Sequence, residues 1–181
     1  MKKITFLILL LTTVIIGYSQ NLYKATSGEI SFFSETPMEN IDAVNKDIKA
    51  LINTKNGDVA FIVVNRGFKF EKPLMEEHFN ENYMESDKYK ASMFKGKIVG
   101  SVDFTKDGAY PVKAKGSLSI HGVEKDREIE GILTIKEGKM IITSTFNINI
   151  KEHKIKIPKL VVKNIAEVVK TTVDLNFELK K

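Results

Sequence analysis

Residues 172–180 read TVDLNFELK, in which every second side chain is apolar. Val173, Leu175, Phe177 and Leu179 alternate with polar neighbours, and successive side chains of a β-strand point to opposite faces. One face of this segment is therefore expected in the core and the other in water. The segment predicts a half-buried strand, which needs neighbouring strands to pair with.

Other segments have the composition of strands and are separated by turns. Asn56-Gly57, Asp107-Gly108 and Glu137-Gly138 are expected to supply the positive φ angles of tight turns. Many short strands joined in this way favour an all-β, antiparallel sandwich or barrel. The strand candidates are Gly28 to Ser34, Asp58 to Asn65, Phe94 to Phe104, Tyr110 to His121, Arg127 to Lys136 and Met140 to Ile150.

Two glycines, Gly96 and Gly100, fall on the apolar side of the segment 94–104. A glycine on an inward face lets a strand bend or leaves room beside a ligand, and bending is the commoner of the two roles.

One stretch, Pro73 to Glu85, has a helical period instead. Its apolar stripe repeats every three or four residues, with Pro73 at a position that a first helical turn tolerates. We expect a helix of about three turns that buries this stripe on the sheet, for example at the mouth of a barrel. The stripe comprises Leu74, Met75, His78, Phe79, Tyr83 and Met84.

The N-terminus has the features of a cleaved signal peptide. Lys2 and Lys3 precede an apolar run from Ile4 to Ile16, which is about 13 residues and shorter than the roughly 20 that span a membrane. We expect residues 1–19 to be the signal peptide, with cleavage after Ser19 or Gln20, and residues 20–181 to be one domain. The chain has no cysteine for a lipoprotein anchor, so the expected location is periplasmic or secreted.

Composition narrows the function classes. The formal charge of +5 includes Lys2 and Lys3, which leaves +3 on the mature chain and does not indicate nucleic-acid binding. Without cysteine, the domain has no disulfides and no thiol chemistry.

The polar residues do not predict an enzyme or a metal site. His78, His121 and His153 lie in different elements without metal-ligand spacing, and no nucleophile motif is present. We expect His121 to make a hydrogen bond near a hairpin. The stretch Asn53 to Asp58 lacks the acidic residues of a calcium loop and predicts a turn. No cofactor is expected.

A basic run near the C-terminus has two interpretations. It is either a solvated strand face or a peripheral contact with an anionic membrane surface. The sequence also leaves a homodimer open. The lysines of this run are Lys151, Lys154, Lys156, Lys159 and Lys163.

Several short motifs occur in a specific order. They are GEISF at 28–32, MEEHF at 75–79, YKASMF at 89–94, LSIHGV at 118–123, Phe146, and IKIP at 155–158. In this order the chain resembles the YceI-like family of exported lipid- or polyisoprenoid-binding proteins, from about Ser27 to the C-terminus. The chain has Lys90 where proline is common in the family, and residues 147–150 lack an arginine often found nearby; both changes leave the apolar alternation intact.

The resemblance implies a lipocalin-like antiparallel barrel of about eight strands, with an interior wide enough for one elongated apolar ligand. The leading hypothesis is a non-enzymatic carrier that buries an isoprenoid or another amphiphilic lipid. The alternative is an interaction or stress-associated scaffold whose barrel is filled by its own side chains. The residues expected to face the ligand are Phe32, Met75, Phe79, Phe94, Ile98, Val102, Leu118, Ile120, Leu133, Phe146, Val173, Leu175 and Phe177.

Overall fold

The computed structural model describes residues 21–158 and 164–180 of the chain. The signal peptide predicted at residues 1–19 lies outside the described residues, and so do Lys159 and Lys163 of the basic run.

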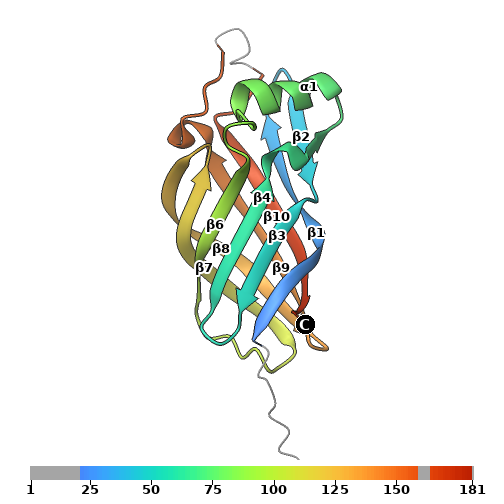
Figure 1. Ribbon diagram of the computed structural model, residues 1–181, viewed down its shortest axis with the longest axis vertical. Helices are drawn as coiled ribbons and strands as arrows, with labels where there is room; N and C mark the ends of the chain where they lie inside the picture. Colours follow the sequence, from blue (N-terminus) through green and yellow to red (C-terminus); the bar gives the residue numbers. More distant parts are fainter. Residues whose placement is uncertain (1–20, 159–163, 181) are drawn as a thin grey trace, which may run out of the picture.

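Eight antiparallel strands close into a barrel (Figure 1). The first strand pairs with the last, for example Ile30 with Val173, and this pairing completes the ring. The all-β barrel predicted from the sequence is therefore confirmed. Around the ring the strands are β1 (Leu22–Glu35), β3 (Ile48–Asn53), β4 (Asp58–Val64), β6 (Ala91–Val99), β7 (Gly108–Ile120), β8 (Val123–Lys136), β9 (Lys139–Asn149) and β10 (Val168–Leu179).

Two short strands extend the wall outside the ring. β1 pairs with β3 at its start and with β2 (Asn40–Asn45) at its end, and β5 (Phe68–Phe70) pairs with β2. Between these two pairings Gly28 has a φ of 117°, and a Cβ there would lie 2.1 Å from the Asp174 carbonyl oxygen. Glycine is therefore required where β1 changes partner. The sequence analysis did not predict β2, β3 or β5.

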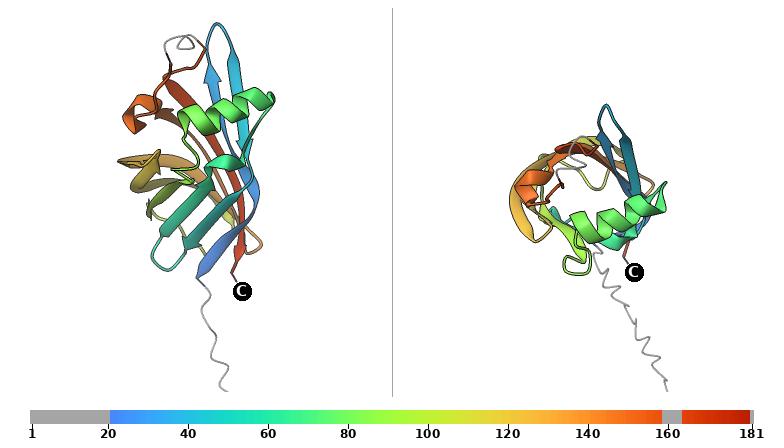
Figure 2. Two further views of the ribbon diagram at one scale, coloured as in Figure 1. Left: turned by 45° about the horizontal axis from the view of Figure 1, so that its top comes forward. Right: turned by 90° about the horizontal axis from the view of Figure 1, so that it is seen from above.

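A single helical segment lies across part of one end of the barrel, as the view from above in Figure 2 shows. It consists of α1 (Pro73–His78) and a π-helical turn, η2 (Phe79–Tyr83), which together make 11 residues. We call this end of the barrel the helix end and the opposite one the closed end. Within the described ranges, no helix has both the length and the apolarity to cross a membrane.

Two 3-10 turns complete the connections. The first, η1 (Asn65–Gly67), joins β4 to β5, and the second, η3 (Ile150–His153), follows β9. Both η1 and η3 lie at the helix end, so the longer connections gather there.

The strand predicted at residues 94–104 is shorter at its C-terminal end. β6 ends at Val99, Gly100 has a φ of 120°, and the Asp103 carboxylate accepts hydrogen bonds from the backbone N–H and the hydroxyl of Thr105. This local turn ends the extended conformation. Placing Gly100, Val102 and Phe104 in the strand was therefore wrong.

The other inward glycine of this region, Gly96, does not face an open space. A Cβ on Gly96 would lie 2.5 Å from the Lys115 carbonyl oxygen and 2.9 Å from the Phe94 ring. Gly96 pairs with Gly116 across the strands. The pair lets β6 and β7 approach closely while the Phe94 ring covers Gly96.

Two of the three predicted turns have the expected backbone. Gly57 has a φ of 78°, and Glu137 and Gly138 have φ values of 51° and 74°. The expectation for Gly108 was wrong, because Gly108 has no positive φ and begins β7. The Asp107 carboxylate instead accepts a hydrogen bond from the Glu137 backbone N–H.

Candidate ligand-binding cavity

A cavity of about 340 Å³ lies inside the barrel; its lining extends from the helical segment to Val59 and Ile98, near the β3–β4 turn. Its volume lies within the range of about 300–1,000 Å³ typical of small-molecule sites. The lining is mainly aliphatic and aromatic and comes from every strand of the ring except β3. Aromatic rings form part of its lining: Phe61 and Phe94 have centroids 6.4 Å apart, and the buried Phe177 packs against Phe61 at 6.3 Å.

Nine of the residues expected to face a ligand line this cavity. Each projects inward from a strand of the barrel or from the helical segment. They are Phe32, Met75, Phe79, Phe94, Ile98, Leu118, Ile120, Phe146 and Val173.

The other four do not line it. Leu133, Leu175 and Phe177 are fully buried in the hydrophobic core near the closed end. Val102 belongs to the loop after β6 and packs against the core from outside the strand. The alternation of apolar residues correctly predicted that Leu133, Leu175 and Phe177 point into the barrel. It does not predict where along the barrel axis a side chain lies.

The helical segment borders the mouth of the cavity. Met75, His78, Phe79, Tyr83 and Met84 all line the cavity, and burial raises the pKa of the Tyr83 hydroxyl. Including Leu74 in this stripe was wrong, because its side chain is 59% exposed. Leu74 precedes Met75 by one residue, which turns it about 100° around the helix.

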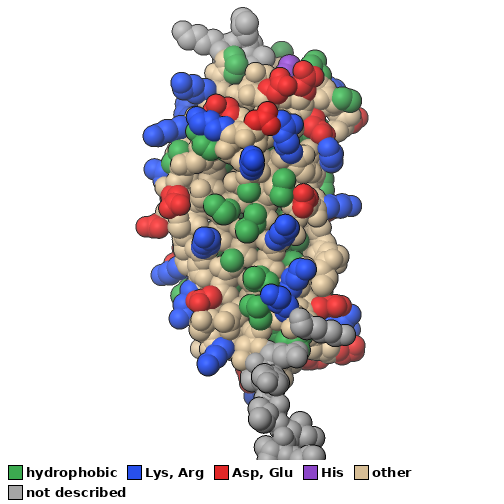
Figure 3. Space-filling view, viewed as in Figure 1, with side chains coloured by type: hydrophobic (Ala, Val, Ile, Leu, Met, Phe, Trp, Pro, Cys, Tyr) green, Lys and Arg blue, Asp and Glu red, His purple; other side chains and the backbone are tan. Residues whose placement is uncertain are grey.

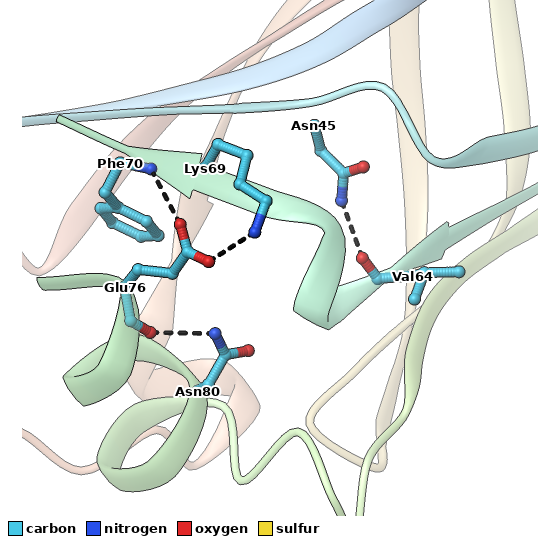
Figure 4. Close-up of polar contacts among 6 residues, drawn as sticks. All are labelled: Asn45, Val64, Lys69, Phe70, Glu76 and Asn80. Atoms are coloured by element: carbon cyan, nitrogen blue, oxygen red, sulfur yellow. Dashed lines mark hydrogen bonds and ion pairs between the residues drawn. The ribbon is translucent and has the colours of Figure 1, made fainter. Parts of the chain in front are cut away.

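Two sets of contacts hold this segment in place. The Phe79 ring lies in an aromatic cluster with Phe32, Phe68 and Phe70, at centroid distances of 5.6, 5.4 and 5.1 Å. On the other side, the Glu76 carboxylate lies 2.5 Å from the Lys69 Nζ and accepts a hydrogen bond from the Phe70 N–H (Figure 4). The helix is therefore fixed to β5 by both apolar and polar contacts.

The wall of the barrel is incomplete beside the cavity. β8 and β9 pair from Lys136 and Lys139 up to Ile132 and Thr143, and no further pairs follow although both strands continue. Above this point side chains bridge the two strands: Ser144 donates to the Glu130 carbonyl oxygen, and Arg127 donates to that of Asn147 at 2.7 Å. Separation of the strands widens the helix-end half.

The hydrogen bond predicted for His121 is confirmed. His121 lies in the turn between β7 and β8, where its Nε2 is 2.8 Å from the Glu85 carboxylate and its Nδ1 is 3.2 Å from the His153 carbonyl oxygen. Both neighbours are hydrogen-bond acceptors. The contact ties the chain after η2 to the β7–β8 turn.

His153 is a buried neighbour of this site. Its Nδ1 donates to the Val123 carbonyl oxygen at 3.2 Å, and burial lowers its pKa. The neutral ring is thus the form that the fold accommodates.

Sequence reasoning missed part of the lining. Phe61 and Val63 lie on β4, where both faces of the strand are apolar, so periodicity could not identify the inward face. Phe68 and Phe70 lie on β5, which has only three residues. The alternation of Phe68, Lys69 and Phe70 was the available indication, but it is too short to distinguish from chance.

The outer surface carries charges of both signs. Figure 3 shows Lys and Arg side chains interspersed with carboxylates and hydrophobic groups on one face. Of the basic run, Lys151, Lys154 and Lys156 are exposed, but Lys151 lies in η3 and the other two follow it, so placing them on a strand was wrong. The described residues contain no cluster of three or more His, Cys, Asp or Glu side chains arranged to hold a metal ion.

A closed antiparallel barrel with one apolar internal cavity defines the class of lipocalin-like barrels, which can enclose a small molecule. Within this class, the chain belongs to the YceI-like domain family, whose sequence model matches residues 15–180. The family predicted from the motifs is therefore confirmed.

Solved structures have the same fold. A polyisoprenoid-binding domain from Saccharophagus degradans, implicated in plant cell wall breakdown, has a TM-score of 0.75 at 12% identity over 87% of this chain and 98% of that one. BcnA of Burkholderia cenocepacia has a TM-score of 0.70 at 11% identity, over 82% and 95%. The YceI protein of Campylobacter jejuni has a TM-score of 0.62 at 15% identity, over 77% and 85%. No curated protein matches the sequence.

Proposed function

We propose that this protein is an exported carrier that holds an isoprenoid or another amphiphilic lipid in the cavity of the barrel. The observation that carries the proposal is the cavity of about 340 Å³, which is bordered by the helical segment and lined mainly by apolar side chains. Similarity to a polyisoprenoid-binding domain supports the choice of ligand class.

Burial alone supplies the binding energy in this proposal. Removing about 300 Å² of lipid surface from water yields roughly 7 kcal/mol at about 25 cal/mol per Å². Immobilising a ligand costs about 4–15 kcal/mol. A longer chain that fills the cavity more completely is therefore expected to bind more tightly, and no catalytic residue takes part.

The cavity also supports the carrier over the scaffold. A scaffold needs only a barrel filled by its own side chains, whereas this barrel contains an apolar cavity of about 340 Å³ beside the packed Leu133, Leu175 and Phe177. An open apolar interior has a stability cost, since its lining side chains lack packing partners. A bound ligand supplies these missing packing partners.

Native mass spectrometry of protein purified without detergent tests the proposal, followed by solvent extraction and identification of any bound molecule. We expect a stoichiometric isoprenoid or lipid. A ligand-free mass that stays unchanged after incubation with polyprenyl compounds would favour the scaffold instead.

Export is a separate part of the proposal and rests on the N-terminal sequence. Cell fractionation with N-terminal sequencing of the purified chain tests it. We expect a mature chain that begins at Gln20 or Asn21 outside the cytoplasm, and an intact Met1 in the cytoplasmic fraction would contradict it.

A further inference from the structure

Two of the uncharged polar side chains that line the cavity, Thr171 and Ser34, lie on adjacent strands. Thr171 lies on β10 and pairs with Phe32 of β1, and Ser34 is the next inward residue of β1. Diagonal neighbours on paired strands are about 7–8 Å apart at Cα and closer at their side chains. One small polar group of a ligand can therefore contact both hydroxyls.

Thr171 is buried without a partner. Its side chain is 6% exposed, and its Oγ1 has no hydrogen-bond partner among the described residues. An unsatisfied buried hydroxyl costs about 1–3 kcal/mol, so a valine of the same shape would be favoured at a purely structural position. Rotation about χ1 exchanges the hydroxyl and the methyl group, and threonine populates more than one such rotamer. The hydroxyl can thus reach the cavity.

Ser34 has spare hydrogen-bonding capacity. Its Oγ accepts a hydrogen bond from the backbone N–H of Ala166 at 2.9 Å. Ala166 lies just before β10, and this contact orients the serine side chain. A hydroxyl that accepts one bond can still donate its own hydrogen. Ser34 is also buried and lines the cavity, so a ligand atom in the cavity is a suitable acceptor for this hydroxyl hydrogen.

The charges around the cavity restrict the head group. Among the described residues, no Lys or Arg lines the cavity; Glu39 does, whereas the Glu130 carboxylate is exposed and pairs with Lys113. Lys72 donates to the Glu39 carboxylate at 2.9 Å and lowers the pKa of that carboxyl, so Glu39 is ionised at neutral pH. A phosphate beside Thr171 would have no Lys or Arg counter-ion among the described residues that line the cavity, which makes its desolvation unfavourable.

We propose that Thr171 and Ser34 form the head-group subsite of this cavity and take an uncharged hydrogen-bonding group, namely a carbonyl, an amide or a hydroxyl. The lipid tail then lies on the apolar wall formed by residues such as Phe94 and Ile120. This inference rests on the proposed function and adds the chemistry and the position of the head group.

Three probes with the same saturated chain test the subsite: hexadecanamide, hexadecyl phosphate and hexadecane. Their affinities are measured by displacement of the fluorescent dye N-phenylnaphthylamine from the wild type, Thr171→Val and Thr171→Ser. Valine removes only the hydroxyl, and serine keeps it. Thermal unfolding of the three ligand-free proteins provides a readout of stability.

The wild type is expected to bind the amide most tightly. Thr171→Val should weaken amide binding about three- to tenfold, leave hexadecane binding unchanged, and leave the melting temperature equal or higher. Thr171→Ser should retain amide binding. Ser34→Ala is expected to weaken amide binding in the same direction.

Three results would overturn the subsite: unchanged amide affinity in Thr171→Val, an equal loss for amide and hexadecane, or tightest binding of the phosphate. These results would overturn the head-group subsite but not the proposal that the protein carries a lipid. If the wild type binds none of the three probes, the proposed function itself fails.

Discussion

At the closed end of the barrel, Leu133, Leu175 and Phe177 are fully buried beside a continuous ladder between β8 and β9. At the helix end the same two strands separate, and the inward side chains surround a cavity. One alternating pattern of apolar residues thus supports both arrangements. The two arrangements differ in whether side chains on facing strands meet across the barrel. We infer that the packed side chains at the closed end stabilise the fold and that the side chains around the cavity bind the ligand.

The largest expected effect is the loss of a ring from the closed end. Phe177→Ala should cost about 3–5 kcal/mol in the free energy of unfolding, because a fully buried Phe leaves a cavity. Phe146→Ala is the matched change at the helix end. Phe146 is half-buried and already borders open space, so its removal should cost less than half as much. Urea denaturation measures both, and equal losses would contradict the division into two halves.

The next effect comes from adding volume at a packed core position and at a position that lines the cavity. Ala50→Phe, at a core position that is 2% exposed, should cost about 1–3 kcal/mol through overpacking. Ala114→Phe places the same ring into the cavity and should leave stability within about 1 kcal/mol of the wild type. It should also reduce lipid uptake, measured by dye displacement. A stable Ala114→Phe protein with undiminished uptake would contradict the location of the ligand.

A smaller effect is expected from pH. Burial lowers the pKa of His153, so the unfolded chain binds a proton at a higher pH than the folded one does. The free energy of unfolding should therefore fall as the pH drops below about 6.5. His153→Asn, which keeps an N–H donor, should reduce this dependence in urea denaturation at several pH values. The opposite slope, with stability rising as the pH falls, would contradict the burial of a neutral ring.

The smallest effect is local. Backbone N–H groups of β8 between Glu124 and Gly131 that point towards β9 have no ladder partner there, whereas those that point towards β7 do. Amide hydrogen exchange should be faster for the first set. Equal protection of both sets would show that the two strands stay paired in solution.

Much of the fold could be predicted from the sequence, because strict alternation identifies strands such as β10 and glycine turns identify hairpins. The missed strands lack one of these features: in β3, Leu51 places an apolar residue on the outer face, and β5 is only three residues long. Local hydrogen bonding also ended β6 before Val102, which alternation alone could not predict.

The site was predicted less completely for a physical reason. Alternation distinguishes the inside of a barrel from the outside, but it carries no information on height along the axis. Leu175 and Val173 are therefore equivalent in sequence, although only Val173 lines the cavity. Thr171 was overlooked because a polar residue on the inward face interrupts the apolar alternation. Its importance comes from its hydroxyl, which has no hydrogen-bond partner among the described residues, and sequence alone cannot show this.

The most direct test of the division between the two halves is methyl NMR of the protein titrated with a polyprenyl alcohol. We predict chemical-shift changes at Ile120, Ile148 and Val173, which line the cavity, and none of comparable size at Leu133, Leu175 and Met140. Equal shifts in both sets would contradict the account, because the ligand would then reach the closed end.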